Sequence, residues 1–180
     1  MSEDPNAALD RDIERLALQE RRLRFSRFDE NTAFALGCGL RALCIERGIA
    51  LAIEVRWMRR TVFRHTMAGT SAANDDWVRR KRNTVELFGQ SSYAVGRMLA
   101  REGESLDTKM GLATRDFATF GGGFPVLLEG AGCVGAVTVS GLPQREDHAL
   151  VVQVLVVQVL VVQVLADLCG VPLAKVVLED

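Results

Sequence analysis

The sequence has almost no surplus of charge, because its 180 residues include 22 Lys and Arg against 23 Asp and Glu, a formal net charge of −1. General nucleic-acid binding favours a strongly basic domain, so this balance argues against it. The first six residues are acidic and polar, with no basic segment leading into an apolar one. No secretory signal is therefore predicted, and we expect a cytoplasmic location.

Histidine and cysteine are scarce, with two and four residues in the chain. They are His65, His148, Cys38, Cys44, Cys133 and Cys169. The cysteines show neither a C-x-x-C spacing nor a zinc pattern, and two histidines alone do not make a metal site. We therefore predict no metal, and we interpret the cysteines as reduced, buried thiols. Cys133, in a strand pattern, is expected to be a core thiol rather than a nucleophile.

One long apolar run is present: residues 151–165 are three copies of the pentapeptide VVQVL. Residues 149–166 carry no charge, which approaches the ~20 residues needed to span a bilayer. Three glutamines interrupt the run and no other such segment exists, so no membrane span is predicted. The valines favour a strand, whereas Pro143, Glu146 and Asp147 favour a helix start.

We predict that the repeats form a lengthened C-terminal helix that projects past the original core. In a helix the glutamines would step ~140° apart, so the repeat would have no polar face. A helix that is apolar on all sides is unstable in water, so the excess should be buried against another subunit. We therefore expect a homo-oligomer built from dimers, with residues 151–165 in an interface.

The remaining pattern predicts an α+β fold, with about five mainly antiparallel strands and packed helices. Residues 1–21 are expected to form an exposed N-terminal helix, and residues 22–180 a single domain. The predicted strands cover 23–28, 49–56, 60–67, 124–129 and 132–140. The predicted helices cover 29–47, 74–88, 91–101, a short segment from 107, and a helix from about 144.

The basic run Arg79–Arg82 has three interpretations. It is a solvated helix face paired with acids, an anion pocket, or a nucleic-acid contact. The acids expected to pair with a solvated face are Asp75, Asp76 and Glu86. In an anion pocket, the convergent donors would be Arg80, Lys81, Ser91 and Ser92, because guanidinium and hydroxyl groups suit carboxylates and phosphates.

The glycine run that begins with Gly121 and Gly122 is not a phosphate loop. It lacks the Gly-Lys-Ser/Thr ending and leads into a strand. It is either a tight bend that needs glycine, or a loop whose amides line a small pocket near Phe120 and Phe124.

The two histidines are weak site candidates. His148 follows Asp147 near a helix start, where a carboxylate could orient an imidazole for proton transfer or ligation. Alternatively, Asp147 and His148 cap the helix, or His148 lies at the surface or in an interface, without a chemical role. His65 lies in a strand pattern and is interpreted as structural. No serine-hydrolase elbow is visible, so no catalytic residue is named.

Several motifs occur together and in order. They are Asn31–Gly37, Phe63–Thr70, Asn74–Asn83, Ser91–Tyr93, Phe117–Pro125 and Val137–Pro143, followed by Asp147 and His148. Over residues 20–170 the chain resembles the haem-degrading-domain family of GlcG/HbpS-like proteins, in its uncharacterised cytosolic branch. The resemblance implies a profilin-like fold with a five-stranded antiparallel sheet and dimer-based homo-oligomers. It also implies haem as a cofactor for some members, but this chain has Phe120 where the family usually has histidine.

Two hypotheses of function follow. The first is a non-enzymatic oligomeric module that binds a small ligand or a protein partner. The second is a haem-binding or haem-handling protein, or a small-molecule enzyme, that uses a pocket near Gly121–Phe124 with His65 or His148. Because no catalytic constellation is recognisable, the first hypothesis is favoured. The cofactor, if any, is unknown, and haem enters only through the resemblance.

Overall fold

The helix predicted over residues 29–47 begins and ends at the residues that the sequence marks as caps, whereas the helix predicted from 74 begins two residues earlier, at Ala72. The structure, a computed structural model, describes residues 5–164. Its helices are α1 (Pro5–Arg22), α2 (Glu30–Arg47), α3 (Ala72–Phe88), α4 (Ser92–Glu102), α5 (Leu106–Met110) and α6 (Gln144–Val164). The Asp29 side chain accepts a hydrogen bond from the backbone N–H of Thr32 at the start of α2, and Gly48 ends that helix with φ +66°. Both caps confirm the sequence prediction.

The strands form one five-stranded sheet in the order β1-β4-β5-β2-β3. They are β1 (Arg24–Phe25), β2 (Ala52–Trp57), β3 (Arg60–Thr66), β4 (Gly123–Leu128) and β5 (Gly132–Ser140). The β1–β4 pair is parallel and the other three pairs are antiparallel. The turn between β2 and β3 has no glycine, and its residues Met58 and Arg59 adopt φ +50° and +62°. The predicted α+β fold with a mainly antiparallel sheet is confirmed.

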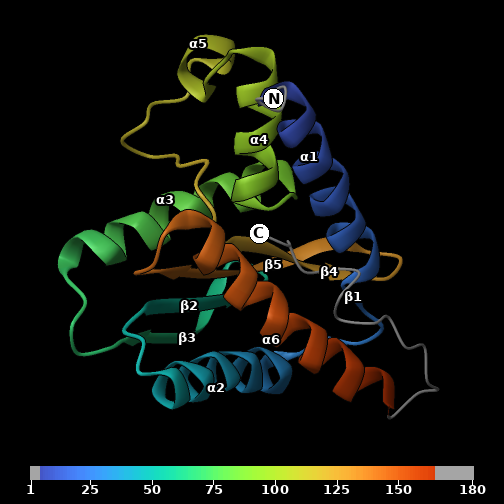
Figure 1. The fold of residues 1–180 in the computed structure, drawn as a ribbon. Coiled ribbons are helices and arrows are strands. Elements are labelled where there is room, and N and C mark those ends of the chain that lie inside the picture. The colour runs from blue at the N-terminus through green and yellow to red at the C-terminus, as the bar shows by residue number, and fades with distance from the viewer. Residues whose placement is uncertain (1–4, 165–180) are drawn as a thin grey trace.

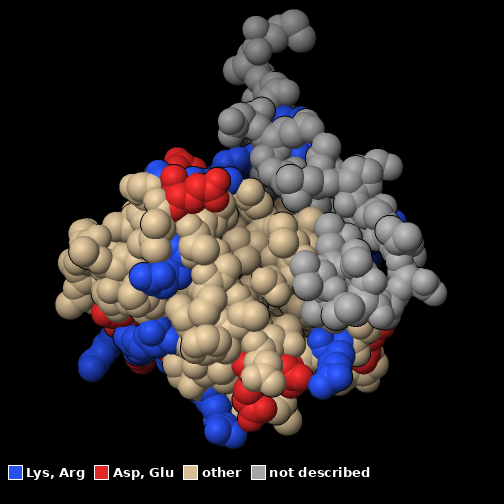
Figure 2. Space-filling model, turned by 90° about the horizontal axis from the view of Figure 1, so that it is seen from below, with Lys and Arg blue, Asp and Glu red and all other residues tan. Residues whose placement is uncertain are grey.

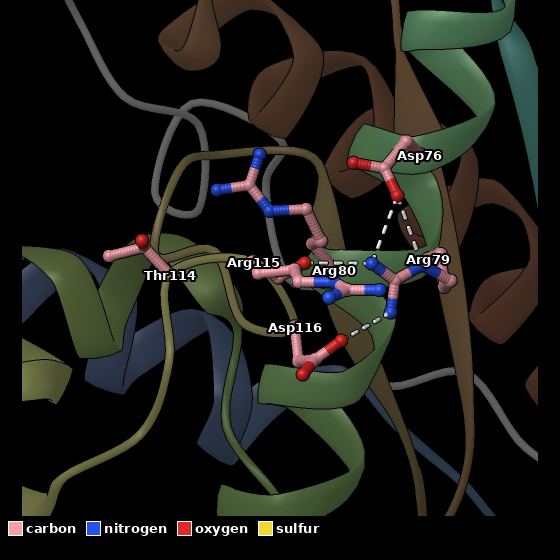
Figure 3. A pocket seen from close by; sticks show the side chains of 6 residues that line it. All are labelled: Asp76, Arg79, Arg80, Thr114, Arg115 and Asp116. Carbon is pink, nitrogen blue, oxygen red and sulfur yellow. Dashed lines mark hydrogen bonds and ion pairs between the residues drawn. The ribbon is translucent and has the colours of Figure 1, made fainter.

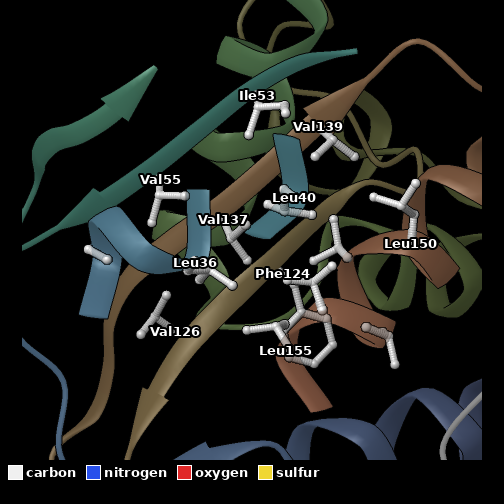
Figure 4. Packing of buried hydrophobic residues seen from close by; sticks show 14 of the residues in the cluster. Leu36, Leu40, Ile53, Val55, Phe124, Val126, Val137, Val139, Leu150 and Leu155 are labelled. Atoms are coloured by element: carbon white, nitrogen blue, oxygen red, sulfur yellow. The ribbon is translucent and has the colours of Figure 1, made fainter. Parts of the chain in front are cut away.

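Helices cover both faces of the sheet (Figure 1). Helices α2 and α6 pack on one face, and α3 packs on the other. Figure 4 shows the core between the sheet and the first pair of helices. Leu36 and Leu40 of α2 and Leu155 of α6 contact the valine-rich strands there, and all three are fully buried. The opposite face of the sheet carries polar side chains toward α3, including the buried Glu54.

The N-terminal helix differs from its prediction. Helix α1 is present, but it is not simply exposed, because Leu16 and Gln19 are fully buried. The helix packs along α4, where Leu16 contacts Tyr93 and Ala94. The apolar stripe of α1 was visible in the sequence, but the helix that would cover it was not. The predicted domain boundary at residues 21 and 22 stays a prediction.

The pentapeptide repeats are helical up to Val164, as predicted. The prediction that the added residues project past the core is wrong for the second copy, because Val156 and Val159 are buried in the protein's own core. Helix α6 packs against α2 here, and Val156 and Val159 join the same buried cluster as Leu36 and Leu40 of α2. Leu165 and the segment after it, including Cys169, lie outside the described residues. Within residues 5–164, no helix combines the length and apolarity that a membrane span requires.

Candidate functional site

An aromatic-walled cavity of about 320 Å³ lies between α3 and the β5–α6 junction. We call it the aromatic cavity. Its lining residues are Asn74, Trp77, Lys81, Phe120, Ser140, Gly141, Leu142, Gln144 and Asp147. Its volume is at the lower end of the ~300–1,000 Å³ that small-molecule sites occupy. The cavity therefore suits a small organic ligand.

A buried ion pair forms the floor of this cavity. Lys81 Nζ lies 2.9 Å from Asp147 Oδ2, and the two side chains are only 3% and 1% exposed. Burial lowers the pKa of Lys81, although the charge of Asp147 opposes that shift. Burial likewise raises the pKa of Asp147, against the opposing effect of Lys81. Each charge therefore partly offsets the effect of burial on the pKa of the other.

Backbone groups hold both members of the pair. Lys81 Nζ also donates to the carbonyl of Val139 at 3.0 Å, and Asp147 Oδ1 accepts from the N–H of Leu142 at 3.0 Å. A lysine ammonium has three donors, and the described residues accept two of them. One charged N–H donor is therefore left beside the cavity.

Two aromatic rings form the wall of the cavity. Trp77 and Phe120 pack edge to face, with ring centroids 5.1 Å apart. The guanidinium of Arg80 lies 4.3 Å from the centre of the Trp77 ring. Phe120 is 47% exposed. A planar apolar group could bind against these rings while its polar end reaches Lys81.

The glycine run packs against the ion pair and does not line the cavity. A Cβ on Gly121 would lie 1.9 Å from the carbonyl oxygen of Gln144. Gly122 has φ +112°, and its Cβ would lie 2.8 Å from Lys81 Nζ. Only glycine fits this close approach, as the tight-bend alternative predicted. Phe124, also expected near a pocket, is fully buried in the core.

The two serines of the predicted anion pocket have structural contacts. Ser91 caps α4 by accepting from the N–H of Ala94 at 3.1 Å. The Ser92 hydroxyl donates to the Phe120 carbonyl at 2.6 Å and accepts from the Gly123 N–H at 3.1 Å. Ser92 thereby fixes the segment that carries Phe120. Neither serine lines the cavity, so the structure does not bring Arg80, Lys81, Ser91 and Ser92 together as one donor set.

The four residues of the basic run Arg79–Arg82 lie in four different environments. Arg79 pairs with Asp76 and Asp116, and Arg82 pairs with the buried Glu54. Lys81 is buried against Asp147, whereas Arg80 stacks on Trp77. The predicted pairing with acids is thus present, although only Asp76 among the expected acids contacts the run. Asp75 pairs with Arg64, and Glu86 pairs with Arg56.

His148 does not form a pair with Asp147, because adjacent helical residues point in different directions. Its Nε2 lies 2.8 Å from Gln19 Oε1, and its ring lies between Tyr93 and Phe124. Desolvation lowers the pKa of His148 to about 3, so the ring is neutral. His65 is far from this region on β3, where Arg41 Nε donates to its Nε2 at 3.3 Å. Neither histidine lines the aromatic cavity.

The remaining candidates from the sequence are metal-ligand groups and the cysteine thiols. No group of three His, Cys, Asp or Glu residues among the described ones could hold a metal ion. Cys44 is buried as expected, but Cys38 and Cys133 are exposed, so the expectation of a core thiol at Cys133 is wrong. Cys133 faces away from the core because the register shifts between Val126 and Leu127, where β5 carries one extra residue. Val134, rather than Cys133, therefore packs against the core.

Sequence reasoning missed the cavity residues Trp77, Asn74, Leu142 and Gln144. Trp77 had a usable signal, because it precedes Lys81 by four residues on one helix and therefore shares its face. Leu142 and Gln144 had none, since they reach the cavity only through the position of the β5–α6 junction.

The fold defines a class: α+β proteins with a five-stranded, mainly antiparallel sheet that helices cover on both faces. Within this class, the chain belongs to the HbpS-like family, because the model described as haem degrading protein HbpS-like matches residues 28–155. Its curated relatives include a UPF0303 protein of Azotobacter vinelandii, 52% identical over 147 residues, which covers 82% of this chain and 89% of the relative. A UPF0303 protein of Sinorhizobium medicae is 48% identical, with 82% and 90% covered.

Solved structures support the same fold. The Ybr137w protein has a TM-score of 0.75 at 28% identity, covering 87% of this chain and 96% of that chain. HbpS has a TM-score of 0.58 at 16% identity, covering 74% and 91%. A PduOC:heme complex has a TM-score of 0.58 at 14% identity, covering 68% and 88%. At such low identity the last two similarities show the fold alone. The family resemblance seen in the motifs is confirmed.

Proposed function

We propose that this protein is a binding module for a small organic ligand that occupies the aromatic cavity. The observation that carries the proposal is a cavity of about 320 Å³ with two aromatic rings on its wall and the Lys81–Asp147 pair on its floor. Apolar walls with a few convergent polar groups are typical of ligand sites. The pair contributes no net charge, so the ligand is expected to combine a planar apolar body with a neutral hydrogen-bond acceptor.

Native mass spectrometry of protein purified from its source tests this proposal. We expect the wild-type protein to retain a small molecule and the Phe120→Ala variant to lose it, because that ring forms part of the wall. Met110→Ala is the matched control, since Met110 is 52% exposed, comparable to Phe120 at 47%, but lies on α5 and does not line the cavity. A molecule retained equally by all three proteins, or by none, would contradict the proposal.

Haem binding is the second candidate, and the names of the family and of the PduOC:heme complex favour it. Haem iron is usually held by His, Cys, Met or Tyr. None of these residue types lines the aromatic cavity. The residues of this cavity therefore do not fit an axially ligated haem, and Phe120 supplies no ligand at the position where the family usually has histidine.

A haemin titration distinguishes the two candidates. We expect no Soret shift at stoichiometric haemin. A saturable shift that His65→Ala abolishes would instead support haem binding at the exposed edge of β3. A shift that His65→Ala does not affect would point to another site, and a companion titration of Phe120→Ala would show whether the aromatic cavity is involved.

We also propose that the chain assembles as a dimer through the side covered by α2 and α6. Seen from that side, uncharged residues occupy much of the described surface, with Lys, Arg, Asp and Glu near its edges (Figure 2). Phe34 and Ile45 of α2 and Val157 of α6 are each more than half exposed. An apolar centre with a charged rim is the usual composition of an interface core. Val157 lies in the second repeat, so this proposal keeps the repeats in the interface.

A further inference from the structure

We propose a second binding site, for an oxyanion of the phosphate class, in a hollow of about 680 Å³ between α3 and the loop that precedes β4. We call it the arginine cavity (Figure 3). Its lining residues are Asp76, Arg79, Arg80, Thr114, Arg115 and Asp116. The site lies outside the aromatic cavity and does not depend on the ligand proposed there.

Arg79 organises the arginine cavity and neutralises its acids. Its guanidinium contacts Asp76 Oδ1 at 2.9 Å and Asp116 Oδ1 at 3.1 Å. It also donates to the carbonyl of Arg115 at 2.7 Å. Both carboxylates of the cavity are therefore already bound, and their repulsion of an incoming anion is reduced.

The loop is fixed to α3 before any ligand binds. Asn83 Nδ2 donates to the Asp116 carbonyl at 2.8 Å. The N–H of Ala118 donates to the Arg80 carbonyl at 3.2 Å. Together with the bond from Arg79, these contacts hold residues 114–116 against the helix. A site whose backbone is ordered in advance loses less conformational entropy on binding.

Arg80 and Arg115 supply the positive charge that is available to an incoming anion. Neither side chain makes an ion pair within residues 5–164, and the buried Nε of Arg80 has no hydrogen-bond partner there. Stacking on Trp77 orients the Arg80 guanidinium without consuming its N–H donors. Three arginines and two aspartates line the cavity, so 3 − 2 leaves a net charge of +1.

The donor types favour phosphate over a carboxylate. Two guanidinium forks and the Thr114 hydroxyl come from two separate elements, α3 and the loop. Guanidinium forks match the oxygen spacing of phosphate groups, and a tetrahedral anion can accept bonds from several directions at once. Free phosphate and a phosphate ester share this chemistry.

Calorimetric titration with inorganic phosphate at constant ionic strength tests the site. We expect saturable binding to the wild-type protein, weakened about ten-fold by Arg80→Gln and by Arg115→Gln, because each substitution removes a charge-assisted hydrogen bond. In a Trp57→Phe background, where Trp77 is the remaining tryptophan, phosphate should change the emission, since it engages the guanidinium stacked on that ring.

Arg97→Gln is the matched control. Arg97 also stacks on an aromatic ring, at 5.0 Å from the centre of Tyr93, and also has a buried Nε without a partner. It does not line the arginine cavity, so its replacement should leave phosphate affinity unchanged. The proposal is wrong if wild-type protein shows no saturable binding, if Arg97→Gln weakens binding as much as Arg80→Gln, or if acetate binds as tightly as phosphate. Phenyl phosphate distinguishes the sources: tighter binding than phosphate supports an ester, and equal binding supports the free ion.

Discussion

At the scale of single residues, His148 shows how burial decides a protonation state. The ring is fully buried, and desolvation together with the charge of Arg145 lowers its pKa from 6.5 to about 3. The unfolded chain therefore binds a proton between pH 6.5 and pH 3 that the folded protein does not bind. The stability that neutral His148 contributes is full above pH 6.5 and decreases as pH falls toward 3.

A comparison of unfolding at two pH values tests this prediction. Between pH 7 and pH 5 we expect this histidine to reduce the free energy of unfolding by roughly 2 kcal/mol, because each pH unit below the unfolded pKa contributes about 1.4 kcal/mol. His148→Gln, whose amide does not titrate, should remove that part of the pH dependence. His65→Gln is the control and should retain it. Equal pH dependence of urea unfolding in wild type and His148→Gln would contradict the assignment.

Lys81 and Asp147 give a second prediction at this scale. Lys81→Met leaves the Asp147 carboxylate buried without a counter-charge, so we expect a loss of about 3 kcal/mol in the free energy of unfolding. The double variant with Asp147→Leu should lose less than the two single variants combined, since it removes both charges. Urea unfolding measures all three.

Lys109→Met serves as the control, because the Lys109–Glu102 pair is about half exposed. An exposed pair contributes less than about 1 kcal/mol, so its loss should be small. If the Lys81 and Lys109 variants lose similar amounts of unfolding free energy, the buried Lys81–Asp147 pair contributes no more to stability than an exposed pair.

At the scale of elements, the second pentapeptide repeat offers a matched pair of valines. Val159 is 4% exposed and Val157 is 52% exposed, although they are two residues apart on α6. Val159→Asp would bury an unpaired carboxylate, and we expect a loss of about 3 kcal/mol or more. Val157→Asp should change the stability of dilute protein by less than about 0.5 kcal/mol, as surface substitutions usually do. Comparable losses would mean that α6 does not pack as described.

The elements themselves were largely predictable because their signals are local. Asp29, Gly48 and Gly89 cap helices where the sequence predicted, and β5 has its predicted bounds of 132–140. The β2–β3 turn was less certain, because Met58 and Arg59 adopt positive φ without the usual Asn or Gly. For the repeats, valine propensity and the helix-start signals disagreed. Packing against α2 is consistent with the helix, and it explains how Val156 and Val159 of the second repeat are buried within one chain.

At the scale of the whole molecule, the candidate site could not be predicted, because its parts are distant in the sequence. Lys81 and Asp147 are 66 residues apart, and Gln19 and His148 are 129 residues apart. The sequence therefore indicated Lys81 and Phe120 as candidates, but it suggested His148 as the partner of Asp147, whereas the structure pairs Asp147 with Lys81. Such contacts depend on how helices lie across the sheet, and no local pattern encodes that arrangement.

Assembly is the remaining property of the whole molecule, and the proposed dimer leads to a definite expectation. Light scattering after size exclusion should give twice the chain mass of 19.7 kDa at micromolar concentration. Val157→Asp should shift the protein toward monomer without unfolding it, because an aspartate in an apolar interface loses its hydration. Met110→Asp is the control, since Met110 is also 52% exposed but lies on α5, on the other side of the molecule from α2 and α6. If the wild-type protein is monomeric, the exposed apolar residues of α2 and α6 are scattered surface residues of the ordinary kind. If Met110→Asp dissociates the dimer as well, the interface lies elsewhere.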